Sequence, residues 1–300
     1  YDGNPSTIDK NPRRVRIEAK TGEADAFVTL LEAGLPLNGD RHVSHFLDFE
    51  NDLFYDTYRL TFVSTHGADQ VQINEVQMFG MKEIEVPIRY VRTDGTGDGS
   101  SWEMASDNLQ AMVSGASTRQ VWVAAGEYYP ENNGLILKND VIIYGGFPAV
   151  GSPGMADRDW NQFATILDGE NTRSVVYNDF YENSPLTASA GLDGFVIRNG
   201  WSDWRGAGIY NVNASPSLSN LTISNNYSEG YGAGIANDEI SSPIITNVLI
   251  TGNNASYSGG GIWNNDASSP VLTNVTLSGN RAEEGGGIYN DGSKDLPTIR

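Results

Sequence analysis

The stretch GGGIWNNDASSPVLTNVTLSGN, from Gly259 to Asn280, decides the fold, because the chain repeats it on both sides. Its Gly-rich part recurs as GAGIYN from Gly206, GAGIAN from Gly232 and GGGIYN from Gly285, so the four copies are separated by 26, 27 and 26 residues. A fixed period of this length indicates a solenoid, a propeller or an array. The second part of each copy contains a proline, and these prolines are 27 residues apart: Pro216, Pro243, Pro270 and Pro297.

The content of each period selects a parallel β-helix. Within the repeats, no segment has the apolar spacing of a helix, and segments such as LTNVTLSG alternate apolar and polar residues, as strands do. A propeller blade needs four strands in roughly 40 residues or more, so a shorter period fits one coil of a β-helix. Equivalent residues of successive coils then stack in columns. We expect an interior stack of Ile209, Ile235, Ile262 and Ile288, and a hydrogen-bonded ladder of Asn220, Asn247 and Asn274.

The repeat GGGIYN…SPxLTNVTLSGN resembles that of right-handed β-helix proteins of the pectate-lyase-like superfamily, in particular the outer-membrane-protein-type repeats of bacterial surface proteins. The preceding YVRTDGTGDGSSWEMASDNLQAMVSGASTRQVWVAAGEYYP resembles the N-terminal cap of these proteins. Its residues predict a helix that starts with a capping box of Ser100 and Glu103. The apolar face of this predicted helix, which would close the open end of the core, contains Trp102, Ala105, Leu109, Met112 and Val113.

We therefore expect an all-β chain: a right-handed parallel β-helix of about 27 residues per coil over residues 91–300, with an N-terminal capping helix and a linker at 83–90. The final LPTIR stops inside a coil without a polar cap. Because a bare coil presents unpaired strand edges, we expect that the C-terminal cap is missing, and that the chain continues or another subunit stacks there.

Residues 1–82 lack the repeat and predict a small β-sandwich. YRLTFVS and the alternating VQINEVQMFG resemble the C-terminal half of discoidin-type, galactose-binding-like jelly-roll modules, and DGNPST resembles their calcium loop. Only three residues separate Thr7 from Asn11, fewer than in that family, so the module is reduced or incomplete. The resemblance implies a Ca²⁺ site, and an all-oxygen set suits this ion. The implied ligands are Asp2, Asn4, Thr7 and Glu75.

Composition limits the function classes. The formal net charge of −19 argues against nucleic acid as a partner and is compatible with cations. The chain has no cysteine, which excludes disulfides and thiolate chemistry, and no apolar run long enough to span a membrane. The absence of cysteine does not fix the compartment, and the resemblance to bacterial surface proteins implies an extracellular or cell-surface location.

Aromatic residues in the polar turns are the main candidates for a binding site. Aromatic rings beside acids and amides are a common way to recognise sugars and protein partners. Acids also recur at these turns, but no Arg or Lys recurs beside them, and Arg205 and Arg281 stand alone. We expect a carbohydrate or partner to contact Trp201, Trp204, Tyr231, Tyr257, Trp263, Asp203, Asp238 and Asp266.

Three functions remain open from the sequence. The first is a non-catalytic surface, adhesion or assembly protein that binds a polysaccharide, a surface glycan or partner chains. The second is a secreted polysaccharide lyase or glycoside hydrolase with an attached binding module, which would need a basic residue within reach of a carboxylate cluster. The third is a subunit of a head-to-tail filament that associates through the ends of the β-helix.

Overall fold

The structure is a computed structural model that describes residues 12–20, 28–34, 57–65, 88–115, 118–292 and 296–300. The chain divides into two compact units, residues 1–83 and 84–300. In the first unit, the described residues form an antiparallel sheet with the strand order β2-β1-β3. An ion pair between Arg59 and Glu18 joins β3 to β1 at 3.0 Å. The strands are β1 (Pro12–Lys20), β2 (Val28–Gly34) and β3 (Thr57–Thr65).

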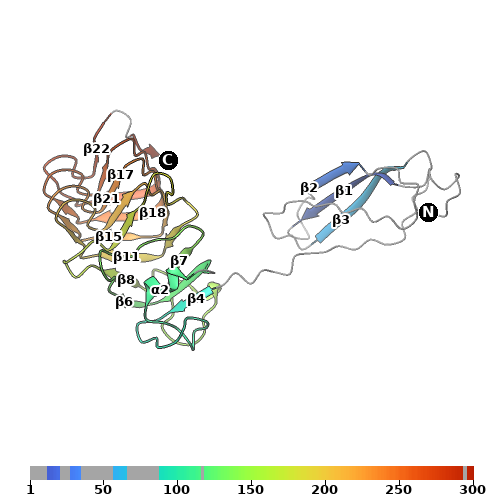
Figure 1. The fold of residues 1–300 in the computed structure, drawn as a ribbon, viewed down its shortest axis with the longest axis horizontal. Helices are drawn as coiled ribbons and strands as arrows, with labels where there is room; N and C mark the ends of the chain where they lie inside the picture. Colours follow the sequence, from blue (N-terminus) through green and yellow to red (C-terminus); the bar gives the residue numbers. More distant parts are fainter. Residues whose placement is uncertain (1–11, 21–27, 35–56, 66–87, 116–117, 293–295) are drawn as a thin grey trace. The chain divides into compact units, whose positions relative to one another are not determined.

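The second unit is a parallel β-helix, as the 27-residue period predicts (Figure 1). Its largest sheet has two parallel columns of strands, and β18 and β21 pass from one column into the other. The strands of the first column are β4 (Ile88–Val91), β5 (Gln120–Ala124), β7 (Ile142–Phe147), β10 (Gly191–Asp193), β14 (Ser217–Ser219), β18 (Ile244–Thr251), β21 (Val271–Ser278) and β23 (Thr298–Ile299). The second column adds β6 (Gly126–Tyr128), β8 (Thr165–Asp168), β11 (Phe195–Arg198) and β15 (Thr222–Ser224).

Two further parallel sheets belong to the later coils. The short sheet consists of β12 (Trp201–Ser202), β16 (Tyr227–Ser228) and β19 (Asn254–Ala255). The sheet that follows the Gly-rich turn, called the third sheet below, consists of β9 (Val176–Asp179), β13 (Ile209–Val212), β17 (Ile235–Asp238), β20 (Ile262–Asn264) and β22 (Ile288–Asn290). Since β4 pairs with β5, the β-helix begins at Ile88, earlier than the predicted boundary at 91.

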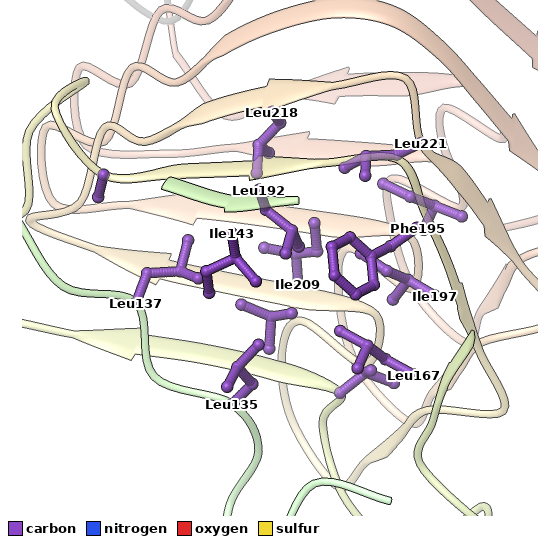
Figure 2. Packing of buried hydrophobic residues seen from close by; sticks show 14 of the residues in the cluster. Leu135, Leu137, Ile143, Leu167, Leu192, Phe195, Ile197, Ile209, Leu218 and Leu221 are labelled. Carbon is purple, nitrogen blue, oxygen red and sulfur yellow. The ribbon is translucent and has the colours of Figure 1, made fainter. Parts of the chain in front are cut away.

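The core consists of stacked apolar columns, one residue per coil. Ile209, Ile235 and Ile262 are paired in register and fully buried, and Ile288 continues the column, which confirms the predicted stack. Figure 2 shows side chains of this cluster, among them Leu192, Phe195 and Ile209, gathered inside the coil. Each buried side chain of this size contributes about 1.5–3 kcal/mol.

Asparagine ladders run parallel to these columns. The predicted ladder is confirmed: Asn274 donates to Asn247 at 2.8 Å, and Asn247 donates to Asn220 at 2.6 Å. These three residues have φ between 52° and 59°, a region that Asn adopts more easily than most residues. A second ladder, inside the third sheet, is buried and has bonds of 2.7–2.9 Å between consecutive members Asn178, Asn211, Asn237, Asn264 and Asn290.

The predicted start of the capping helix is wrong. The helix α2 spans Leu109–Ser114 and its N-cap is Asn108, whose side chain accepts a hydrogen bond from the amide of Ala111 at 2.9 Å. The residues around the expected capping box are instead held by backbone bonds to the preceding loop, for example from Gly97 N to Ala105 O at 2.9 Å. The carboxylate of Glu103 accepts from Ser152. The Ser100–Glu103 motif therefore belongs to a paired loop.

Candidate ligand-binding site

The candidate site forms where the Gly-rich turn folds back over the outer face of the third sheet. Gly206, Gly232 and Gly259 have φ of 66°, 62° and 69°, so L side chains would strain the backbone there. A Cβ at Gly206 would lie 2.6 Å from the Cβ of Tyr210 on β13. This close approach brings the residues just before each glycine over the sheet.

Tyr231 is the centre of an aromatic group in this turn. Its ring centroid lies 5.3 Å from that of Trp204, 5.6 Å from that of Tyr257 and 5.2 Å from that of Trp263. Backbone hydrogen bonds place Trp204, Gly230 and Tyr257 in one column. Gly230 lies between Trp204 and Tyr257 in this column. Because glycine has no side chain, a gap one coil wide separates the two rings, and the ring of Tyr231 contacts both.

Arg205 lies among these rings and forms an ion pair with Asp238 of β17. Its guanidinium carbon is 4.7 Å from the ring centroid of Trp263 and 5.5 Å from that of Trp204, within the range of cation–π attraction. Asp238 is only 3% exposed, and its other carboxylate oxygen accepts a bond from Asn265 at 2.9 Å. We call the set Trp204, Arg205, Tyr231, Asp238, Tyr257 and Trp263 the aromatic–arginine cluster.

The buried side of this cluster is incompletely hydrogen-bonded. The Nε of Arg205 and the Nε1 of Trp263 are both buried, and neither has a partner among the described atoms. The cluster also affects Tyr210: burial, together with the charge of Asp238, raises the pKa of Tyr210 to about 12, against the opposing effect of Arg205. At neutral pH the phenol of Tyr210 is therefore a neutral hydrogen-bonding group.

The structure brings together five of the eight predicted contact residues. Trp204 and Tyr257 are 51% and 49% exposed, so a ligand has access to their rings. Trp263 is 1% exposed, because Tyr231 and Arg205 cover it. The remaining three predicted residues, Trp201, Asp203 and Asp266, make no ring contact or ion pair with the cluster in the described part of the chain.

Arg205 belongs to the cluster but was not among the predicted contact residues. It stands alone in its column, because the next coils carry Tyr231 and Ser258 at this position. Its partner Asp238 is 33 residues away, which is one period plus six residues, so the column alignment does not pair them. The predicted calcium ligands Asp2, Asn4, Thr7 and Glu75 lie outside the described residues. Within the described residues, no group of three or more His, Asp or Glu is arranged to hold a metal ion.

Fold and cluster define a parallel β-helix protein with an aromatic and charged surface group. The model of a family described as "Protein of unknown function (DUF1565)" matches residues 96–298, and the chain belongs to this family. No curated protein and no solved structure matches the chain significantly. Across the residues that the structure describes, no helix is long and apolar enough to cross a membrane.

Proposed function

We propose that this chain is a non-catalytic extracellular or cell-surface protein that binds carbohydrate through the aromatic–arginine cluster. The observation that carries the proposal is the contact of Tyr231 with two half-exposed rings, those of Trp204 and Tyr257. Aromatic rings present apolar faces with little loss of side-chain entropy, and the C–H faces of sugars pack on such faces. The polar groups of exposed Asp203 and Glu229, in the same turns, supply hydrogen bonds to hydroxyl groups.

The environment of Arg205 supports binding in preference to catalysis. A general base must reach a substrate proton with a free lone pair. The guanidinium of Arg205 is instead engaged by Asp238 and lies against three rings. In this arrangement the arginine holds the turn against the third sheet. We extend the proposal to the first unit, where a calcium site at Asp2, Asn4, Thr7 and Glu75 would belong to an attached carbohydrate-binding module of the galactose-binding-like type.

The proposal is tested by affinity electrophoresis in native gels that contain soluble polysaccharides, first with the full chain. Trp204→Ala and Tyr257→Ala should each weaken retardation about tenfold, which corresponds to about 1.4 kcal/mol. Tyr181→Ala is the matched control, because Tyr181 is an 82% exposed tyrosine outside the cluster. Equal binding by all three variants would refute a role for the cluster.

The non-catalytic part of the proposal has its own assay. Acidic polysaccharides are incubated with the full chain, with and without Ca²⁺, and unsaturated uronate products are measured by their ultraviolet absorbance. Reducing ends are measured in parallel to detect hydrolysis. We expect no product in either assay, and product formation by the native chain would refute the non-catalytic proposal and identify a polysaccharide-degrading enzyme.

A further inference from the structure

A groove of about 300 Å³ lies on a different face of the β-helix, over the outer side of the largest sheet. Its floor contains the asparagine ladder of Asn220, Asn247 and Asn274, with Thr222 and Thr276 beside it. Trp160 and Asn161 line the same groove from the loop after the 3-10 helix η1 (Met155–Asp157). No lining residue is charged. We propose that this groove binds a neutral, linear polysaccharide that runs along the axis of the β-helix.

The position of Trp160 depends on two glycines. In the column of the ladder, the coil before Asn220 carries Gly194 (φ 81°), where a Cβ would lie 2.3 Å from Nη2 of Arg158 and 3.2 Å from the Cβ of Trp160. At Gly146 (φ 90°), a Cβ would lie 2.7 Å from the Cα of Trp160. Because Gly146 and Gly194 have no side chains, the loop packs directly against the sheet. Trp160 therefore lies next to the position that precedes Asn220 in the ladder column.

The loop is also fixed by its own hydrogen bonds. Arg158 donates from Nε to the carbonyl oxygen of Gly145 at 2.6 Å and forms an ion pair with Asp193. Its guanidinium lies 4.8 Å from the ring centroid of Trp160. One face of this half-buried ring is thus covered by a cation. A ring held rigidly beside a groove is available for stacking without a large entropic cost.

The ladder carries hydrogen-bonding capacity that the protein does not use. Asn220 donates to Asp193 at 3.0 Å, and the ladder continues through Asn247 to Asn274. A side-chain amide can donate two hydrogen bonds and accept two. In the described structure, the side chain of Asn247 donates once and accepts once. One N–H and one lone pair therefore remain for a ligand.

Spacing and charge select the ligand class. Neighbouring coils are about 4.8 Å apart, so a ligand along the axis meets one amide at each such step. In an extended β-1,4-linked sugar chain every second residue presents the same groups to one side, and this repeat spans about two such steps, so the chain stays in register with the amides. A peptide strand repeats its same-side groups about every 6.6 Å and would lose register with the amides. The uncharged lining and the net charge of −19 favour a neutral polymer over an acidic one.

The experiment measures retardation of the full chain in native gels containing hydroxyethylcellulose, xylan or glucomannan as neutral polymers, and polygalacturonate as an acidic one. We expect binding to at least one neutral polymer, weakened about tenfold by Trp160→Ala and by Asn247→Gly. Gly is chosen for Asn247 because that residue has φ 59°, and Gly194 already occupies the same column. The matched control is Asn225→Gly, an exposed Asn with φ 55° outside the groove, which should bind normally.

The outcomes separate this site from the aromatic–arginine cluster. Loss of neutral-polymer binding in the groove variants, with Trp204→Ala unaffected, supports the groove alone. Loss in Trp204→Ala only, or no binding of any neutral polymer by the native chain, overturns the groove proposal. Binding of an extended peptide that Asn247→Gly abolishes would also overturn it. Circular dichroism checks the fold of each variant, and Thr276→Val, which keeps the β-branched shape of an exposed residue, replaces any variant that fails to fold.

Discussion

Arg205 pairs with Asp238, a residue 33 positions further along the chain. Arg205 precedes β13, and Asp238 lies on β17, the paired strand of the next coil. The carboxylate is buried, and it has one further side-chain donor, Asn265. Breaking a buried pair by removing one partner leaves an uncompensated charge, which costs more than the pair itself contributes. This contact therefore fixes the turn that carries Trp204 to the third sheet.

Replacement of Arg205 should destabilise the β-helix. We expect Arg205→Met to lower the free energy of unfolding by about 3 kcal/mol, since the methionine retains the packing on the rings but leaves Asp238 without its counterion. Urea unfolding, followed by tryptophan fluorescence, measures the change. The double variant Arg205→Met with Asp238→Asn should recover part of the loss.

Arg281→Met is the control for this substitution. Arg281 is exposed and forms no ion pair within the described residues, so its replacement should change stability by less than about 0.5 kcal/mol. Equal effects of the two single substitutions would show that the Arg205–Asp238 pair does not stabilise the fold.

Replacing an asparagine in the middle of the buried ladder should lower the free energy of unfolding more than replacing Asn290, the last described member. Asn237→Ala removes two hydrogen bonds and leaves buried polar atoms of Asn211 and Asn264 without partners. Each such atom costs about 1–3 kcal/mol, so we expect a loss of about 3 kcal/mol. Asn290→Ala, at a half-buried position with one ladder bond, should lose about 1 kcal/mol or less. Thermal and urea unfolding of both variants give the comparison.

The fold follows from the sequence because stacking requires equivalent residues at equal intervals. Ile209, Ile235 and Ile262 occupy the same phase of the period and pair in register. The cap was harder to predict, since Ser100 and Glu103 satisfy a helix-capping pattern while their segment gains more backbone bonds by pairing with the loop at Gly97. At this segment, backbone pairing with the preceding loop determined the structure, although the local sequence pattern favoured a helix start.

The site was predictable only in part, for a related reason. Aligning the repeats shows which residues stack in one column. It does not show which side chains contact residues of a different column. Trp263 was a predicted ligand contact, yet Tyr231 and Arg205 from a different part of the coil cover it. The groove at Trp160 was missed because its wall comes from an irregular loop that no repeat contains.

Close backbone approach between coils makes Gly234 costly to replace. A Cβ at Gly234 would lie 2.4 Å from the carbonyl oxygen of Gly261 on the next coil, and backbone cannot move aside cheaply. We expect Gly234→Ala to lose about 3 kcal/mol, at the upper end for overpacking. Gly191→Ala is the control: its nearest neighbour is a side-chain methyl of Ile142 at 3.1 Å, so we expect less than about 1 kcal/mol. Melting temperatures of the two variants decide the matter.

Tyr210 should make the stability of the β-helix fall at alkaline pH. Its pKa is raised to about 12 in the folded chain, mainly by burial and then by Asp238, whereas an unfolded tyrosine ionises near pH 10. Below pH 10 the phenol is neutral in both states and the folding equilibrium is unaffected. Between pH 10 and about 12 the unfolded state loses the proton first, so rising pH favours unfolding.

The measurement is urea unfolding at several pH values across this window, for the native chain and for Tyr210→Phe. The native chain should lose stability more steeply with pH than Tyr210→Phe, because the variant lacks this titrating group. A phenolate absorbance titration of the folded chain should show one fewer late-ionising tyrosine in the variant. Parallel pH profiles for the two proteins would mean that Tyr210 ionises normally and that neither burial nor Asp238 controls it.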